Sequence, residues 1–170
     1  YAPIVPMVLV NGTKGIGTGF STDIMCHNPL QIIDHIQNML LKKPEAEWGP
    51  IEPYYRGFKG TITPLSTSGS GGKYLVRGLH AVDAAKKQVR VTELPVGYWT
   101  EDFKKHLESL IETNLIKDYV DMSTDTVVDF TITFPATASM DSAIVDHGCC
   151  TALEKLLKLY TTESTSNMHL

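Results

Sequence analysis

Apolar residues first form a short continuous run and then recur at helical spacing. The run covers residues 4–10 and ends at Asn11-Gly12, which predicts a buried strand that meets a turn. After Asn28-Pro29, apolar side chains recur three or four positions apart, at Ile32, Ile33, Ile36, Met39 and Leu40. This spacing predicts an amphipathic helix that begins near Pro29 and stops before Lys42-Lys43-Pro44.

The middle of the chain is predicted to form strands on either side of a second helix. Strand-like segments cover 60–64, 74–79 and 88–93, and the Ser/Gly-rich stretch 66–72 predicts an exposed hairpin loop. Thr100 is a candidate N-cap for a helix with Phe103, Leu107, Leu110 and Ile111 on one face. A β-rich run follows at 127–134, and 153–159 fits no single period. We therefore expect an α+β fold, with a mixed or antiparallel sheet and flanking helices.

Charge and cysteine content narrow the class of protein. The net charge is −4, whereas a simple nucleic-acid-binding module is usually basic, so basic groups for such a partner must cluster locally or lie in other domains. Three cysteines are an odd count, which favours a reduced, intracellular protein. No signal peptide or membrane span is expected. The chain starts at Tyr1, and we expect it to be cut from something longer.

A glycine-studded loop at 12–19 is the most conspicuous motif. It fails as a dinucleotide fingerprint, because Phe20 stands where the third glycine belongs, and as a Walker A loop, because Thr18 stands at the lysine position. The loop-shaping residues are Asn11, Gly12, Gly15, Gly17 and Gly19. Ile16 is bulky, β-branched and isolated among them, so we expect it to be exposed and stiff. Such a residue on a tight turn is suited to wedge between stacked base pairs, although a plain flexible turn is the alternative.

Other groups of polar residues carry less information. Cys26-His27, and His147 with Cys149-Cys150, lack the spacing of a metal site and of a Cys/His nucleophile, so no metal site is expected. Asp118, Asp121, Asp125 and Asp129 fit a solvated sheet edge better than a cluster, with Asp129 on a solvent-facing side.

A segment near the end of the chain combines a base, hydroxyls and an amide, all of which contact phosphates in protein–DNA complexes. A plain loop or an edge strand is the alternative. Its residues are Lys158, Leu159, Tyr160, Thr161, Thr162, Glu163, Ser164, Thr165, Ser166 and Asn167.

Four ordered motifs together resemble one family. These are 6–12 with 15–19 and Ser21-Thr22, then 55–62, then 92–96 with Trp99-Thr100, and finally 161–170. They resemble the eukaryotic-type type IIA DNA topoisomerases, in the part that follows the winged-helix domain and includes the tower domain. On this resemblance, 1–28 is a DNA-bending segment and 29–170 is the tower domain, leading toward the coiled-coil gate.

The resemblance implies a homodimeric nuclear enzyme that passes one DNA duplex through a transient break in another, using ATP and Mg²⁺. A DNA-containing organelle is the alternative location. It also implies that Ile16 is the DNA wedge and that 158–167 contact DNA. None of the seven tyrosines follows an arginine, as the family's nucleophile does, and there is no Asp-x-Asp pair for the cleavage metal. We therefore expect no catalytic residue, cofactor or metal site in this chain. A non-catalytic DNA-binding or scaffold module of the same fold is the alternative.

Overall fold

The computed structural model describes residues 3–19, 21–66, 72–135 and 150–168, which fall into two compact units. Unit 1 takes the described residues between 3 and 57 together with 72 and 164–168, and unit 2 takes 58–66 and those between 73 and 163. Most of the loop predicted at 66–72, and Phe20, His147 and Cys149, lie outside the described residues. No described helix has the length and apolar character needed to cross a membrane.

Unit 1 combines short helices with one two-stranded ribbon. Its elements are α1 (Met7–Asn11), β1 (Thr13–Ile16), β2 (Ser21–Ile24), α2 (Pro29–Leu40) and the 3₁₀ turns η1 (Glu45–Glu47) and η2 (Thr165–Asn167). The strand predicted at 4–10 was wrong. The chain turns into α1 after Pro6, and none of its residues is buried. A short apolar run cannot distinguish a strand from a helical turn by periodicity alone.

Helix α2 confirms the prediction from spacing. The side chain of Asn28 caps it by accepting a hydrogen bond from the amide of Leu30 at 2.9 Å, and Pro29 occupies its first turn. Only Ile32 of this helix is buried, whereas Met39 and Leu40 are exposed. The pattern therefore located the helix correctly, but most of its apolar face is not covered by the described residues.

Unit 2 holds two antiparallel sheets. The strands are β3 (Thr61–Ser66), β4 (Lys73–Arg77), β5 (Leu79–Asp83), β6 (Gln88–Glu93), β7 (Asp118–Asp121), β8 (Phe130–Thr133) and β9 (Tyr160–Ser164). One sheet has the order β3-β4-β9 and the other the order β5-β6-β8-β7. Ser164, the last residue of β9, belongs to unit 1. The predicted α+β class is confirmed.

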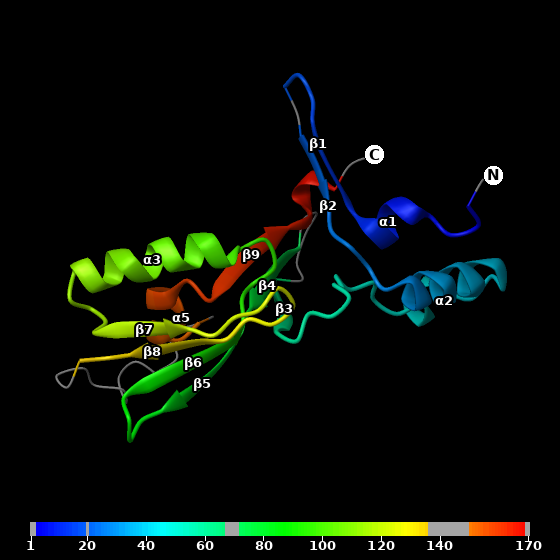
Figure 1. Ribbon diagram of the computed structural model, residues 1–170. Helices are drawn as coiled ribbons and strands as arrows, with labels where there is room; N and C mark the ends of the chain where they lie inside the picture. Colours follow the sequence, from blue (N-terminus) through cyan, green and yellow to red (C-terminus); the bar gives the residue numbers. More distant parts are fainter. Residues whose placement is uncertain (1–2, 20, 67–71, 136–149, 169–170) are drawn as a thin grey trace. The chain divides into compact units, whose positions relative to one another are not determined.

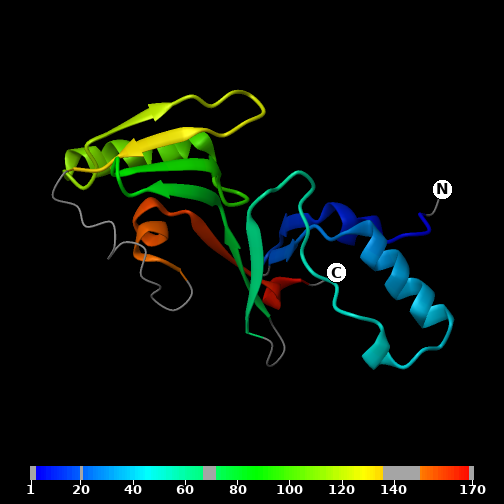
Figure 2. The same ribbon diagram turned by 90° about the horizontal axis from the view of Figure 1, so that it is seen from below.

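The core of unit 2 lies between the four-stranded sheet and two helices, α3 (Thr100–Glu112) and α5 (Ala152–Leu157). Figure 1 shows both helices on the same side of this sheet, and Figure 2 views the sheet from the other side, with α3 behind it. Alternate sheet residues and one face of each helix supply the buried side chains: Val89, Val91, Phe130, Ile132, Phe103, Leu107, Leu110, Leu153 and Leu157. Burial therefore follows period two in the strands and helical spacing in α3.

The helix caps differ from the prediction at one end. Trp99, not Thr100, is the N-cap of α3, and no side chain caps it. The carboxylates of Glu101 and Asp102 stand in the first turn, where the helix dipole favours negative charge. Helix α5, in the segment that had no clear period, begins with a capping box in which Thr151 and Glu154 satisfy each other's backbone amides.

The four aspartates do not form one cluster. Asp118 and Asp121 lie on β7, an edge strand, as expected. Asp129 is less exposed than predicted, because the guanidinium of Arg90 donates two hydrogen bonds to it, at 2.9 and 2.6 Å. Asp121 forms an ion pair with Lys104 on α3 at 2.7 Å, and this pair lowers the pKa of Asp121 from 3.8 to about 2. The Lys104–Asp121 ion pair therefore connects the edge strand β7 to α3.

The Lys104–Asp121 pair predicts a pH-dependent contribution to stability. The folded-state pKa of Asp121 is depressed, so its contribution is present above pH 3.8 and is lost as pH falls through about 2. We expect Asp121→Asn to lower the free energy of unfolding at pH 7 by up to about 1 kcal/mol, since the pair is partly exposed. The deficit should vanish near pH 2. Urea unfolding between pH 2 and 7 measures it, with the exposed Asp125→Asn as control, and a deficit that does not change with pH would contradict the expectation.

Candidate nucleic-acid interface

The glycine loop forms a β-hairpin with Ile16 at its end. Strands β1 and β2 pair antiparallel from Thr13↔Ile24 at the root to Ile16↔Ser21 next to the turn. Figure 1 shows this ribbon standing clear of α1 and α2 of the same unit. The side chain of Ile16 is 92% exposed, which confirms the expected exposure. We call residues 13–24 the wedge hairpin; insertion of Ile16 into DNA stays a prediction.

The loop-shaping residues act at different places. Gly12 follows α1 with a φ of +66°, and a Cβ there would lie 2.5 Å from the carbonyl oxygen of Ile24. Gly15 faces Thr22 across the ribbon, Gly17 follows Ile16 directly, and Gly19 has a φ of +90° with open space around it. Asn11 ends α1, and its carbonyl accepts a hydrogen bond from the Cys26 thiol at 3.0 Å. Gly12 is therefore required both by close packing and by backbone conformation, and Gly19 by backbone conformation alone.

An ion pair crosses the wedge hairpin. Lys14 and Asp23 are register partners on the two strands, and their side chains meet at 2.8 Å. The lysine remains largely exposed. The charge of Lys14 is thus partly compensated within the hairpin.

The segment 158–167 is not a plain loop. Lys158 ends α5 in the left-handed conformation, Leu159 is fully buried in the core of unit 2, and β9 and η2 then follow. The side chain of Leu159 anchors the segment, whereas those of Lys158, Thr162, Ser166 and Asn167 are exposed. The hydroxyl-rich stretch is therefore held by β-pairing and by a buried leucine.

The structure brings part of this segment against the wedge hairpin. Thr22 on β2 donates a hydrogen bond to the backbone carbonyl of Asn167 at 3.3 Å. Thr165 is fixed in turn by hydrogen bonds from its amide and hydroxyl to the carbonyl of Gly72. Ser164 to Asn167 thus share unit 1 with Ile16, whereas Lys158 to Glu163 belong to unit 2. No local pattern could indicate this contact, because its two residues are far apart in the sequence.

The unit 2 part of the segment lines a concavity of about 440 Å³. Its lining residues are Tyr98, Lys155, Lys158, Tyr160, Thr161 and Thr162. The hydroxyl oxygen of Thr161 is buried and has no hydrogen-bond partner among the described residues. Burial, followed by the charge of Asp102, raises the pKa of Tyr98, so this phenol stays protonated as a donor at neutral pH. Two lysines and several hydroxyls gathered in one hollow suit an anionic ligand.

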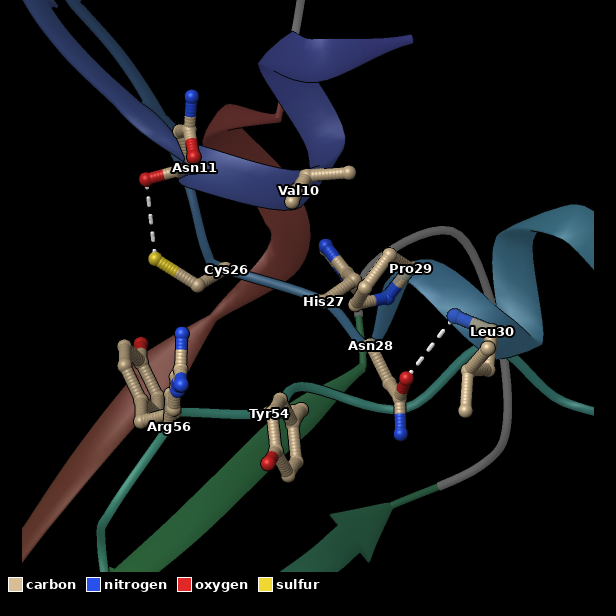
Figure 3. A pocket seen from close by; sticks show the side chains of 10 residues that line it. Val10, Asn11, Cys26, His27, Asn28, Pro29, Leu30, Tyr54 and Arg56 are labelled. Carbon is tan, nitrogen blue, oxygen red and sulfur yellow. Dashed lines mark hydrogen bonds between the residues drawn. The ribbon is translucent and has the colours of Figure 1, made fainter. Parts of the chain in front are cut away.

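A second concavity, of about 670 Å³, lies at the root of the wedge hairpin and was not found from the sequence (Figure 3). We call it the root pocket. Burial raises the pKa of the Cys26 thiol, which is therefore a weak nucleophile. No three histidine, cysteine or carboxylate side chains of the described residues come close enough together to hold a metal ion. The lining residues are Val10, Asn11, Cys26, His27, Asn28, Pro29, Leu30, Tyr54, Tyr55 and Arg56.

Comparison with known proteins assigns the family. The family model for the A subunit of DNA gyrase/topoisomerase IV matches residues 1–170. This chain belongs to that family. Among the relatives of this topoisomerase chain, DNA topoisomerase 2 of Pisum sativum is 39% identical over 176 residues, covering 100% of the chain and 11% of the pea protein. The mitochondrial DNA topoisomerase 2 of Dictyostelium discoideum is 34% identical, covering 100% of the chain and 12% of that protein.

A solved structure agrees with this assignment. The DNA-binding, cleavage and re-ligation domain of Plasmodium falciparum topoisomerase II superposes with a TM-score of 0.85 at 36% identity, covering 100% of this chain and 22% of the other. The resemblance to eukaryotic-type topoisomerases is therefore confirmed. This topoisomerase chain is homologous to the DNA-binding and cleavage–re-ligation region, and it spans about a tenth of the relatives' length.

Proposed function

We propose that this chain is the DNA-binding and DNA-bending part of an ATP-dependent type II topoisomerase. The full-length protein would pass one duplex through a transient double-strand break in another. The observation that carries the proposal is the wedge hairpin, with an isoleucine 92% exposed at its end, in a chain homologous to a DNA-binding and cleavage region. An exposed apolar side chain on a narrow ribbon has the shape needed to enter between base pairs.

The two parts of the interface would have separate roles. Ile16 would unstack one base step and so kink the duplex, and smooth bending of a short site costs about 1–6 kcal/mol. Backbone contacts must offset that cost. The hydroxyls and bases of 158–167 would provide them, since side chains of this kind position DNA without reading its sequence. Thr22 and Asn167, joined at 3.3 Å, would link the two roles within unit 1.

The cofactors of the full-length enzyme would be bound elsewhere. We propose Mg²⁺ and ATP as cofactors, a homodimer as the assembly and double-stranded DNA as the substrate. The described residues of this chain offer no group of three metal-ligating side chains, and its sequence has no Arg-Tyr pair for a nucleophile. Other parts of the full-length protein would therefore carry out strand cleavage. The nucleus is the proposed location, with a DNA-containing organelle as the alternative, which the mitochondrial relative illustrates.

The proposal predicts different results for the chain and for the full-length protein. Incubated with supercoiled plasmid, Mg²⁺ and ATP, the full-length protein should relax the plasmid, and residues 1–170 alone should leave its topology unchanged. Gel electrophoresis of the plasmid measures both. Relaxation by the chain that persists through further purification would contradict the assignment of roles. A full-length protein that binds DNA but never relaxes it would instead favour a non-catalytic module.

A further inference from the structure

The root pocket has the charge of an anion site. Its lining contains Arg56 but no aspartate or glutamate. Arg56 is exposed, and it takes part in none of the ion pairs found among the described residues. Its planar guanidinium can donate two parallel hydrogen bonds to a phosphate. Such a fork, at the edge of a hollow whose lining has no acidic group, favours a negatively charged ligand.

Two side chains in the wall of the root pocket are held by hydrogen bonds. The Cys26 thiol already donates to the carbonyl of Asn11, and the ring Nδ1 of buried His27 lies 3.1 Å from the carbonyl oxygen of Leu9. Helix α2 begins at the same place, so the positive end of its dipole adds to the charge of Arg56. Figure 3 shows Asn11 and Cys26 on one side of the pocket and Asn28, at the start of α2, on the other. The root pocket thus combines side chains fixed by hydrogen bonds, the start of helix α2 and the exposed guanidinium of Arg56.

We propose that the root pocket holds a backbone phosphate of the same duplex that Ile16 kinks, with Arg56 as its cation. This rests on the proposed function. Asn11 lines the pocket and Ile16 ends β1, so the chain between them can span at most about 17 Å. Phosphates follow one another every 3.4 Å along each strand. The captured phosphate would therefore lie within about five base pairs of the kinked step.

Capture of a flanking phosphate would help to hold the duplex that Ile16 kinks. Contacts at two separate points, one at the kinked step and one on a flank, fix the path of the duplex between them. A contact that forms only with bent DNA stabilises the bent form and offsets part of the deformation energy. Arg56 is then a DNA-positioning residue, and Ile16 acts as the wedge.

The test compares charge variants of the full-length protein on a short duplex. We expect Arg56→Ala to reduce the slope of log K against log salt by about 0.9, the loss of one phosphate contact. Arg56→Lys should keep the slope but weaken binding, since the ammonium lacks the planar fork. Lys43→Ala removes an equal charge beyond the other end of α2, outside the root-pocket lining, and should leave the slope unchanged. Melting temperatures of all variants should match, because both side chains are exposed.

A scan of neutral methylphosphonate linkages locates the contact. Neutralising one flanking phosphate should weaken binding by the wild-type protein but not by Arg56→Ala. If the wild type binds the duplex and Arg56→Ala keeps its slope, or if Lys43→Ala loses the same amount, the pocket assignment is wrong while the proposed function stands. A wild type that does not bind duplex DNA would overturn the proposed function itself. Inorganic phosphate that stabilises the wild type but not Arg56→Ala, without any change in duplex slope, would assign the pocket to a free phosphate instead.

Discussion

Replacing Ile16 by alanine in the full-length protein should reduce DNA bending and cleavage while leaving the fold intact. Burying an isoleucine side chain contributes about 1.5–3 kcal/mol relative to leaving it in water. Alanine keeps part of this, so about 1–2 kcal/mol is lost when the wedge enters DNA. That corresponds to a loss of about 5- to 30-fold in the bent, cleavage-competent complex. Energy transfer between dyes at the two ends of a short duplex measures DNA bending. A plasmid cleavage assay measures the loss of DNA cleavage.

The chain offers a matched control in the same unit. Ile32 on α2 is 2% exposed, whereas Ile16 is 92% exposed. Ile32→Ala should cost about 2–5 kcal/mol of stability, as expected when a large core side chain is truncated. Ile16→Ala should stay within about 0.5 kcal/mol of the wild type, as surface substitutions do. An Ile16→Ala variant that is destabilised and still bends DNA normally would overturn the wedge assignment.

Where burial follows a regular period, the sequence pattern was sufficient to predict the helix or strand and its buried side chains. In β6 the buried Val89 and Val91 alternate with the exposed Arg90, and α3 buries Phe103, Leu107 and Leu110. Alternation and helical spacing are direct consequences of where Cβ atoms point, so these elements could be predicted. The exposure of Ile16 followed from its isolation among glycines. These features depend only on neighbours in the sequence.

The failures lie where neighbouring residues carry too little information, and several of them involve contacts between segments far apart in the chain. Nothing local distinguishes the 4–10 run as a helical turn, and nothing near Asp129 indicates that Arg90 covers it. The contact between Thr22 and Asn167 and the root pocket both join segments far apart in the chain. A glycine pattern alone also could not separate Gly12, which faces the Ile24 carbonyl, from Gly19, which faces open space.

That difference between the two glycines gives the second large prediction. Gly12→Ala should destabilise unit 1, because alanine at a φ of +66° is strained by about 1–3 kcal/mol and its Cβ would also lie 2.5 Å from the Ile24 carbonyl oxygen. The same Cβ would lie 3.2 Å from the Cys26 sulfur. Relief of these contacts must spread the root of the wedge hairpin at its Thr13↔Ile24 pair. Denaturant unfolding measures the loss of stability.

Gly19→Ala provides the comparison, since its φ of +90° carries backbone strain while no atom lies within 4 Å of the added Cβ. The excess loss in Gly12→Ala over Gly19→Ala then isolates steric crowding at the root. Gly12→Ala should also bend DNA less than the wild type although Ile16 is intact, because a wedge transmits force only through a firm root. Equal stability of the two variants, or normal bending by Gly12→Ala, would show that the hairpin root yields without cost. Support for Ile16 would then have to come from DNA contacts elsewhere, such as those of 158–167.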